Sequence, residues 1–261
     1  MYSTVKILGV KVHDITMTDA LKTMKSFIDT GKPHMICTPN VDHVIKAQRD
    51  PEFRSIIDSA DLSIPDGMGI VYASRLLGQP LTGNVGGRLL LPAFCELSSK
   101  ERYSIYLLGA APGIASKAAQ LLVERYPGLR VGGTHSPSYG FRTGGKEDQR
   151  AVKKINMARP QVLFVAFGAP KQEKWIKSHL EELQVPVCMG VGYAFDVIAG
   201  RVKESPKWMT RVGLEWLFRL TQEPKRLWRR YLIEDPWFFY LIVKAALLRQ
   251  VCKDWHRNCP S

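Results

Sequence analysis

The stretch "PQVLFVAFGAPKQEKWI", residues 160–176, decides the fold class. It begins with an apolar run, residues 162–167, in which polar and apolar positions do not alternate. Such runs are typical of strands that are buried on both faces, as in parallel sheets covered by helices. Gly168 ends the run, Pro170 stands where a helix can begin, and residues with helical spacing follow. The stretch therefore predicts a buried strand that leads directly into a helix.

The same pattern recurs along the first two hundred residues. Four more apolar runs are typical of buried strands: "HMICTP" (34–39), "YSIYLLGA" (103–110), "LRVGGTH" (129–135) and "VPVCMGVG" (185–192). Segments with helical spacing occupy residues 41–60, 113–127, 146–158 and 170–183. This alternation predicts right-handed βαβ units, and hence an α/β, Rossmann-like domain over residues 1–200 with a mostly parallel sheet flanked by helices. Ligands of such sheets bind beyond the carboxyl ends of the strands, so the residues there are the site candidates.

Composition narrows the class of protein. The chain has 261 residues, of which 45% are hydrophobic, enough for a sizeable core. We expect no signal peptide and no membrane-spanning helix, because the N-terminus lacks a long apolar core and no apolar stretch reaches about 18 residues. Its five cysteines are scattered without a C-x-x-C pair, which indicates neither a zinc site nor a disulfide framework. A reducing cytoplasm is the expected location.

The net charge of +13 is concentrated toward the C-terminus. Residues 201–261 carry 13 Lys and Arg against 6 Asp and Glu, and residues 213–250 are helical in pattern, aromatic and basic. We predict that residues 201–261 form a basic helical appendage, which Pro224 and Pro236 divide into short helices. A basic surface suits nucleic acid, anionic lipid headgroups or a phosphorylated substrate.

"LSIPDGMGIV", residues 62–71, places an acidic side chain, Asp66, between a proline and a glycine. Proline fixes φ near −65° and glycine tolerates almost any φ. Such a turn either aims the carboxylate out of the end of a strand or simply reverses the chain. The sequence alone leaves both interpretations open.

Polar residues also follow the strand at 34–39. Thr38 and Asn40 lie at its carboxyl end, and Asp42 and His43 come directly after them. Asn40 or Asp42 is equally suited to cap the next helix. His43 is a candidate general base, although a lone histidine is more often structural.

The turn after Gly168 carries a second polar cluster, Lys171, Gln172 and Glu173. A lysine in the first turn of a helix opposes the helix dipole, so a bound anion or sugar hydroxyls would compensate for it, unless Glu173 balances it. Asp196 follows a glycine-rich strand end, where it either accepts hydrogen bonds from a ligand or caps the next helix.

Several function classes lack their motifs. The chain has no P-loop, no G-x-S-x-G and no H-E-x-x-H, which argues against P-loop NTPases, α/β-hydrolases and zincins. "GAAPG" (109–113) is not G-x-G-x-x-G, which counts against a nucleotide-dependent oxidoreductase. The apolar, aromatic stretch 237–248 and the lack of a nucleic-acid motif count against a nucleic-acid-binding module. There is no D-x-D motif, which many nucleotide-sugar enzymes use to hold a divalent metal.

Five long motifs together identify a family. "TPNVDH", "LSIPDGMGIV", "FVAFGAPKQEKWI", "GVGYAFDVIAGRVKESPKWM" and "GLEWLFRLTQEPKRLWRRYL" closely resemble the WecG/TagA/CpsF family of bacterial glycosyltransferases, in order from about residue 5 to about residue 235. The resemblance implies an inverting enzyme at the cytoplasmic face of the plasma membrane that moves a sugar from a UDP donor to an undecaprenyl-diphosphate-linked sugar. The sugar implied first is N-acetylmannosamine or its uronic acid, the acceptor is lipid-linked N-acetylglucosamine, and the products feed teichoic acid or other cell-surface polysaccharides.

The resemblance also assigns roles to residues of this chain. It implies that Asp66 is the catalytic base, which takes the proton of the acceptor hydroxyl. With no metal or other cofactor expected, protein cations would stabilise the departing UDP, and Arg88 is the first candidate. The remaining implied substrate-binding residues are Thr38 and Asn40 beside the sugar, Gln172 in the pocket, Asp196 near the uridine, and the C-terminal arginines Arg219, Arg226 and Arg229.

The resemblance gives the appendage a role as well, because in the family a basic C-terminal segment approaches the active site and meets an anionic membrane. The run "PWFFYLIVKAALL" (236–248) either lies in the membrane interface or packs on the main domain. A homo-oligomeric state stays open. The alternative function is transfer of another hexose, such as glucose, for exopolysaccharide on a lipid-diphosphate-linked acceptor.

Overall fold

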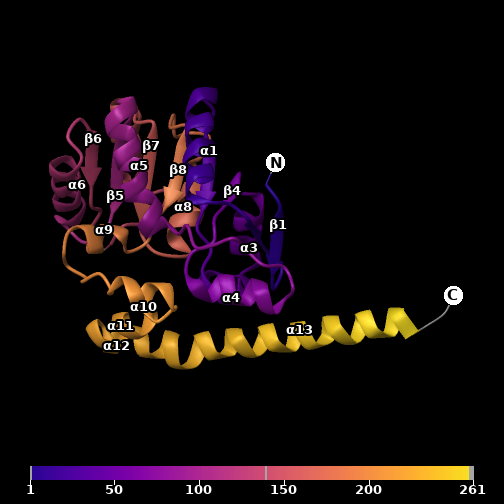
Figure 1. Cartoon of the computed structure of the whole chain (residues 1–261). Helices are drawn as coiled ribbons and strands as arrows, with labels where there is room; N and C mark the ends of the chain where they lie inside the picture. Colours follow the sequence, from indigo (N-terminus) through magenta and orange to yellow (C-terminus); the bar gives the residue numbers. More distant parts are fainter. Residues whose placement is uncertain (1, 139, 259–261) are drawn as a thin grey trace.

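A computed structural model describes residues 2–138 and 140–258 of the chain. Among these residues, six strands form one fully parallel sheet in the order β4-β3-β8-β7-β5-β6 (Figure 1). The strands are β3 (His34–Cys37), β4 (Leu62–Ser63), β5 (Ser104–Gly109), β6 (Arg130–His135), β7 (Val162–Ala166) and β8 (Val187–Gly190). The five strands expected from apolar runs are all present, and the predicted α/β, Rossmann-like fold is confirmed.

Helices cover both faces of the sheet because successive strand residues point to opposite sides. Cys188 of β8 belongs to one core cluster, while its neighbours Val187 and Met189 belong to the other. The first cluster lies under α2 (Val41–Arg49), α3 (Pro51–Ser59), α4 (Met68–Leu76), α7 (Lys146–Ala158) and α8 (Lys171–His179). The second lies under α1 (Met17–Thr30), α5 (Gly87–Glu101), α6 (Ile114–Arg125) and α9 (Ala194–Ile198).

The direction in which each strand continues opens the carboxyl edge of the sheet. Strand β8 continues into α9 on one face, whereas its two neighbours, β3 and β7, continue into α2 and α8 on the other. Chains that leave neighbouring strands toward opposite faces create a crevice at the strand ends. The strand-end residues of β3, β7 and β8 therefore lie beside this crevice.

Two local features differ from the expectation for the N-terminal half. The predicted helical segment 41–60 is two helices, because Asp50 ends α2 and caps α3 by accepting a hydrogen bond from the Phe53 N–H at 3.0 Å, with Pro51 in the first position of α3. An antiparallel hairpin, β1 (Thr4–Ile7) and β2 (Val10–His13), precedes the sheet and buries alternate residues in the first core cluster. The sequence patterns did not predict it.

Beyond residue 200 the chain is helical, as predicted, but its divisions differ. The elements are α10 (Lys207–Arg211), α11 (Glu215–Gln222), α12 (Pro224–Arg229), the π-helical turn η1 (Arg230–Glu234) and α13 (Asp235–Asn258). Pro224 begins a helix, but the expectation that Pro236 divides the segment is wrong, because α12, η1 and α13 follow one another without a break. The wider turn, in which the Asp235 N–H donates to the Arg230 carbonyl, accommodates a proline that lacks an N–H donor.

Helix α13 runs along the base of the molecule in Figure 1, next to α2 and α4. Phe238 and Ile242 are fully buried in the first core cluster. Trp237 and Tyr240, on the other side of the same turns, are half exposed. Core packing therefore holds for one face of residues 236–248, and the other face is open. Within the described residues, no helix is both long enough and apolar enough to span a membrane.

Candidate active site

A cavity of about 750 Å³ lies between the carboxyl edge of the sheet and the C-terminal helices. One wall comes from the loops after β3 and β4 and from the start of α5, and the opposite wall comes from α10, α11, η1 and the start of α13. Its polar lining consists of Asn40, Asp66, Tyr72, Asn84, Arg88, Tyr193, Thr210, Glu215, Arg219, Arg230, Tyr231 and Asp235. Apolar side chains, among them Met68, Trp216 and Phe239, line the rest.

Two loops hold Asp66 in this cavity. The Asp66 N–H donates to the Pro39 carbonyl at 3.1 Å, and the Gly67 N–H donates to the Asn84 side-chain oxygen at 2.9 Å. Gly86 faces the carboxylate so closely that an added Cβ would lie 1.6 Å from Asp66 Oδ1. The glycine therefore makes room for the Asp66 carboxylate. The turn places this side chain in the cavity at the carboxyl edge of the sheet and does not merely reverse the chain.

Electrostatics favour a proton-accepting role for Asp66. Burial, and next the negative charge of Glu215, raise the pKa of Asp66, while the hydrogen bond from Asn40 Nδ2 at 3.3 Å and the charges of His43 and Arg88 oppose the rise. A carboxylate whose pKa is raised is a stronger base than an ordinary one. The geometry thus gives the cavity a basic group.

Cationic side chains line the same cavity as Asp66. Arg88 binds two carboxylates of the C-terminal segment, Glu204 at 2.5 Å and Glu215 at 2.9 Å. The hydroxyl of Tyr193 donates to Glu215 at 2.6 Å, and the guanidinium of Arg219 lies 3.5 Å from the centre of the Tyr193 ring. These contacts connect the start of α5 and the end of β8 to α11 on the opposite wall.

The rival bases have other contacts. Asp42 accepts a hydrogen bond from Lys46 at 2.8 Å and lies 3.9 Å from Arg230, and these cations together lower its pKa despite burial. His43 is buried behind Asn40 and does not line the cavity. Neither side chain lines the cavity that Asp66 lines.

A cavity with two carboxyl groups of raised pKa, Asp66 and Asp235, several arginines and an apolar side suits transfer of a group between a charged donor and an amphipathic acceptor. Comparison with known proteins supports this chemistry. The model of the glycosyl transferase WecG/TagA/CpsF family matches residues 5–251. The chain belongs to this family.

Curated relatives in the WecG/TagA/CpsF family include two of similar length. The Staphylococcus aureus (strain MW2) protein named N-acetylglucosaminyldiphosphoundecaprenol N-acetyl-beta-D-mannosaminyltransferase is 32% identical over 243 residues, 92% of each chain. The Bacillus spizizenii protein of the same name is 32% identical over 208 residues, 79% of this chain and 78% of the relative. The family match over residues 5–251 spans both the sheet and most of the C-terminal helices.

The structure brings four of the predicted site residues to the cavity, namely Asn40, Asp66, Arg88 and Arg219. Thr38 and Gln172 lie in the crevice behind them, where the Thr38 hydroxyl donates to the Gly190 carbonyl at 3.3 Å. Gln172 Oε1 accepts hydrogen bonds from the N–H groups of Gly168 and Gly192 at 3.1 and 3.0 Å. Both side chains tie neighbouring strand ends together.

The other three predicted residues do not line the cavity. Asp196 is half buried at the start of α9 and lies 3.3 Å from Arg201, and burial raises its pKa. Arg226 pairs with Glu223, and Arg229 approaches Glu234 at 3.9 Å. Both arginine side chains are largely exposed.

Sequence reasoning missed the other eight polar residues that line the cavity, namely Tyr72, Asn84, Tyr193, Thr210, Glu215, Arg230, Tyr231 and Asp235. Arg230 lies in the same basic run as Arg226 and Arg229, but the run alone does not reveal which arginine faces inward. No group of three or more His, Cys, Asp or Glu able to hold a metal ion occurs within the ranges that the structure describes.

Proposed function

We propose that this protein transfers N-acetylmannosamine, or its uronic acid, from a UDP-linked donor to undecaprenyl-diphosphate-linked N-acetylglucosamine, with inversion at the anomeric carbon. The observation that carries the proposal is the Asp66 carboxylate, held in a cavity with Arg88 and Arg219 in a chain of this family. The names of its relatives supply the sugar and the acceptor.

Asp66 acts as the base in this proposal. The acceptor hydroxyl attacks the anomeric carbon, its proton passes to the Asp66 carboxylate, and the bond from that carbon to the UDP oxygen breaks. Inversion requires a single displacement, so one carboxylate suffices. General-base help of this kind contributes about 10²–10⁴-fold to the rate.

The arginines of the cavity stabilise the departing diphosphate. Arg88 is bound to Glu204 and Glu215, and a bound diphosphate would take over part of these contacts. Arg219 and Arg230 reach the same cavity from the C-terminal helices. Guanidinium groups suit diphosphate because they offer paired donors. Thr38 and Gln172 contact the sugar of the donor, and Asp196 lies near its uridine. Arg226 and Arg229 contact the diphosphate or face the anionic membrane.

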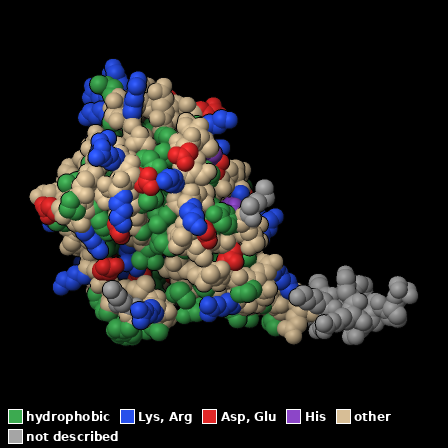
Figure 2. Space-filling view, turned by 45° about the horizontal axis from the view of Figure 1, so that its top comes forward, with side chains coloured by type: hydrophobic (Ala, Val, Ile, Leu, Met, Phe, Trp, Pro, Cys, Tyr) green, Lys and Arg blue, Asp and Glu red, His purple; other side chains and the backbone are tan. Residues whose placement is uncertain are grey.

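The C-terminal helices dock on an anionic membrane surface in this proposal. Of the 16 large apolar side chains that are exposed among the described residues, 13 lie beyond residue 207, including Trp208, Trp228 and Trp237. Figure 2 shows apolar side chains gathered along the lower edge of the molecule, with Lys and Arg side chains between them. Tryptophan and basic residues are typical of surfaces that lie in the headgroup region. The apolar side of the cavity opens next to this surface, where a lipid-linked acceptor would arrive.

The proposal is tested by UDP release from a panel of UDP-sugars in the presence of a short-chain lipid-diphosphate N-acetylglucosamine. UDP-N-acetylmannosamine or its uronic acid is expected to react, with formation of the disaccharide lipid, and to react in EDTA. Turnover of UDP-glucose instead would favour the hexosyltransferase alternative. Lack of UDP release from every donor would reject the proposed function.

A further inference from the structure

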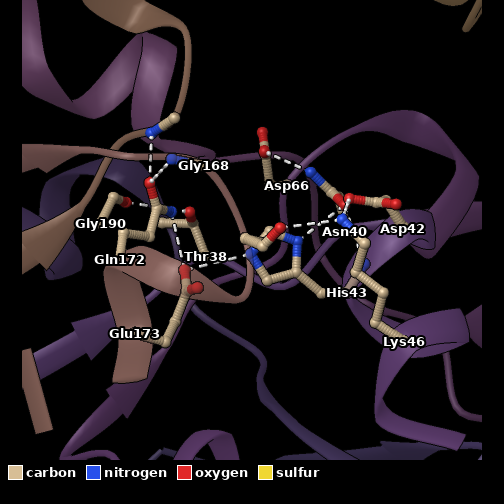
Figure 3. Close-up of polar contacts among 12 residues, drawn as sticks. Thr38, Asn40, Asp42, His43, Lys46, Asp66, Gly168, Gln172, Glu173 and Gly190 are labelled. Carbon is tan, nitrogen blue, oxygen red and sulfur yellow. Dashed lines mark hydrogen bonds and ion pairs between the residues drawn. The ribbon is translucent and has the colours of Figure 1, made fainter. Parts of the chain in front are cut away.

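Four side chains behind Asp66 form an unbroken chain of polar contacts (Figure 3). Asn40 Nδ2 donates to Asp66 Oδ2 at 3.3 Å, and His43 Nδ1 lies 2.8 Å from Asn40 Oδ1. On its other side, His43 Nε2 lies 3.2 Å from Glu173 Oε1, which also accepts a hydrogen bond from Gln172 Nε2 at 2.7 Å. These polar contacts extend from the cavity to the crevice between β3, β7 and β8.

The backbone fixes both ends of this chain. Asn40 caps α2, and its Oδ1 accepts the backbone N–H of His43 at 3.2 Å, so its amide nitrogen must face Asp66. At the far end, Gln172 Oε1 accepts two backbone N–H groups, so its amide nitrogen must face Glu173. Gly190 makes room there, because an added Cβ would lie 2.6 Å from Gln172 Nε2.

These constraints leave one proton between His43 and Glu173. Because Asn40 Oδ1 is an acceptor, His43 Nδ1 must carry a hydrogen. His43 Nε2 then faces a carboxylate oxygen, and two acceptors cannot bond to each other without a proton. Either the histidine is an imidazolium or Glu173 is protonated. With Glu173 protonated, every donor points toward Asp66, whereas an imidazolium donates from both ring nitrogens, to Asn40 and to Glu173.

The pair is expensive to bury, which indicates a purpose beyond packing. Glu173 is 0% exposed, and its Oε2 has no hydrogen-bond partner among the described residues. His43 is 5% exposed. Buried carboxylates and imidazoles stabilise a fold only when their partners compensate for lost hydration, and an apolar pair of similar volume is often as stable.

We propose that His43 and Glu173 are positioning residues of the transfer reaction: by sharing this buried proton they lock the Asn40 amide, which in turn holds the Asp66 carboxylate toward the acceptor. The inference rests on the proposed function of Asp66. Neither residue touches the substrate, so both act on the rate of the chemical step and not on binding of the donor.

A double-mutant cycle tests whether Glu173 acts on Asp66 through Asn40. Glu173→Gln keeps the size of the side chain, but its amide cannot both accept from Gln172 and satisfy His43 without a new unpaired group. We expect Glu173→Gln to lower kcat by about 10- to 100-fold, since small displacements of reacting groups cost this much, while KM for the UDP-sugar changes less than about threefold. Asn40→Ala lowers kcat similarly. The double variant is no slower than Asn40→Ala alone, because both act through one path.

A matched control comes from the same helix layer. Asp148 on α7 is also a buried carboxylate bound to a histidine, His179, at 3.1 Å, and to Trp175 at 2.6 Å, but it does not line the cavity. Asp148→Asn is expected to lower the melting temperature as Glu173→Gln does and to leave kcat within about twofold. Unchanged kcat in Glu173→Gln, or kcat losses that multiply in the double variant, would overturn the proposal.

The protonation of His43 gives a readout that does not depend on activity or on a stable variant. In ¹⁵N NMR spectra of the wild-type protein, with the His43 signals assigned by their absence in His43→Asn, Nδ1 is expected to carry a hydrogen and to correlate with it. A His43 ring that carries a hydrogen at Nε2 alone would overturn the proposal even if the enzyme is active. If the wild-type enzyme is inactive toward every donor, the proposed function is rejected. This spectrum then still tests the arrangement of hydrogens between Asn40, His43 and Glu173.

Discussion

Gly86→Ala displaces the Asp66 carboxylate without changing its chemistry. Gly86 has φ −44° and ψ 165°, outside the left-handed region, so alanine introduces no backbone strain there. The new Cβ would lie 1.6 Å from Asp66 Oδ1, 2.4 Å from Cγ and 2.8 Å from Cβ. Since carbon and oxygen touch at about 3.3 Å, Oδ1 must move by about 1.7 Å. Rotation about χ1 does not relieve the contact at Asp66 Cβ, so a loop must also shift.

A displacement of this size is expected to lower kcat by about 10²-fold. Overpacking of one methyl costs about 1–3 kcal/mol, so the melting temperature falls by about 2–12 °C. Gly83→Ala is the matched control, because nothing lies within 4 Å of a Cβ at this position in the same loop. Both variants are assayed by UDP release and thermal unfolding. A Gly86→Ala enzyme that is folded and keeps kcat within about threefold of wild type would refute the argument that the position of the Asp66 carboxylate matters.

Two further predictions concern pH and the C-terminal helix. Asp66 must be ionised to accept a proton, and burial and the charge of Glu215 raise its pKa. We therefore expect kcat/KM to fall as the pH drops through a pKa above the usual aspartate value of about 3.9, and Glu215→Gln to move this fall to lower pH. A fall in kcat/KM at the usual aspartate pKa would contradict the assignment of Asp66 as the base. Phe238 is fully buried, so Phe238→Ala should lower the free energy of unfolding by about 3–5 kcal/mol. Trp237 is half exposed, so Trp237→Ala should change the free energy of unfolding by less than about 0.5 kcal/mol. In a flotation assay, Trp237→Ala should bind anionic vesicles about tenfold more weakly than wild type. Equal vesicle binding by Trp237→Ala and wild type would count against membrane docking by this face.

The sheet was predictable because four of its strands, β3, β5, β7 and β8, are buried on both faces and have continuous apolar sequences. The expectation that residues 129–135 form a buried strand is wrong in one respect, because β6 lies at the edge of the sheet and its residues are exposed or half-buried. The edge strand β4 has only two residues, and the β1–β2 hairpin alternates polar and apolar positions over four residues each, too short a pattern to recognise. Pro236 misled because a proline normally ends a helix, whereas here a π-helical turn absorbs it.

The residues of the site were predictable as far as they follow strands. Asn40 and Asp66 stand at strand ends, where the α/β fold itself gathers ligands. The inward face of the C-terminal helices was not, because arginines of one basic run point to both sides: Arg226 and Arg229 are largely exposed, whereas Arg230 lines the cavity. Glu215 was missed because its role depends on a contact with Arg88 that is 127 residues away in the chain.

The central claim is that Asp66 is the base of a sugar transfer to a lipid-linked acceptor. The most direct measurement is the single-turnover rate of wild type and Asp66→Asn with UDP-N-acetylmannosamine and the lipid-diphosphate N-acetylglucosamine, together with the Kd for UDP. Wild type is expected to form the disaccharide lipid, and Asp66→Asn is expected to bind UDP within about threefold of wild type but to transfer the sugar at least about 10²-fold more slowly. Transfer by Asp66→Asn at the wild-type rate would contradict the claim.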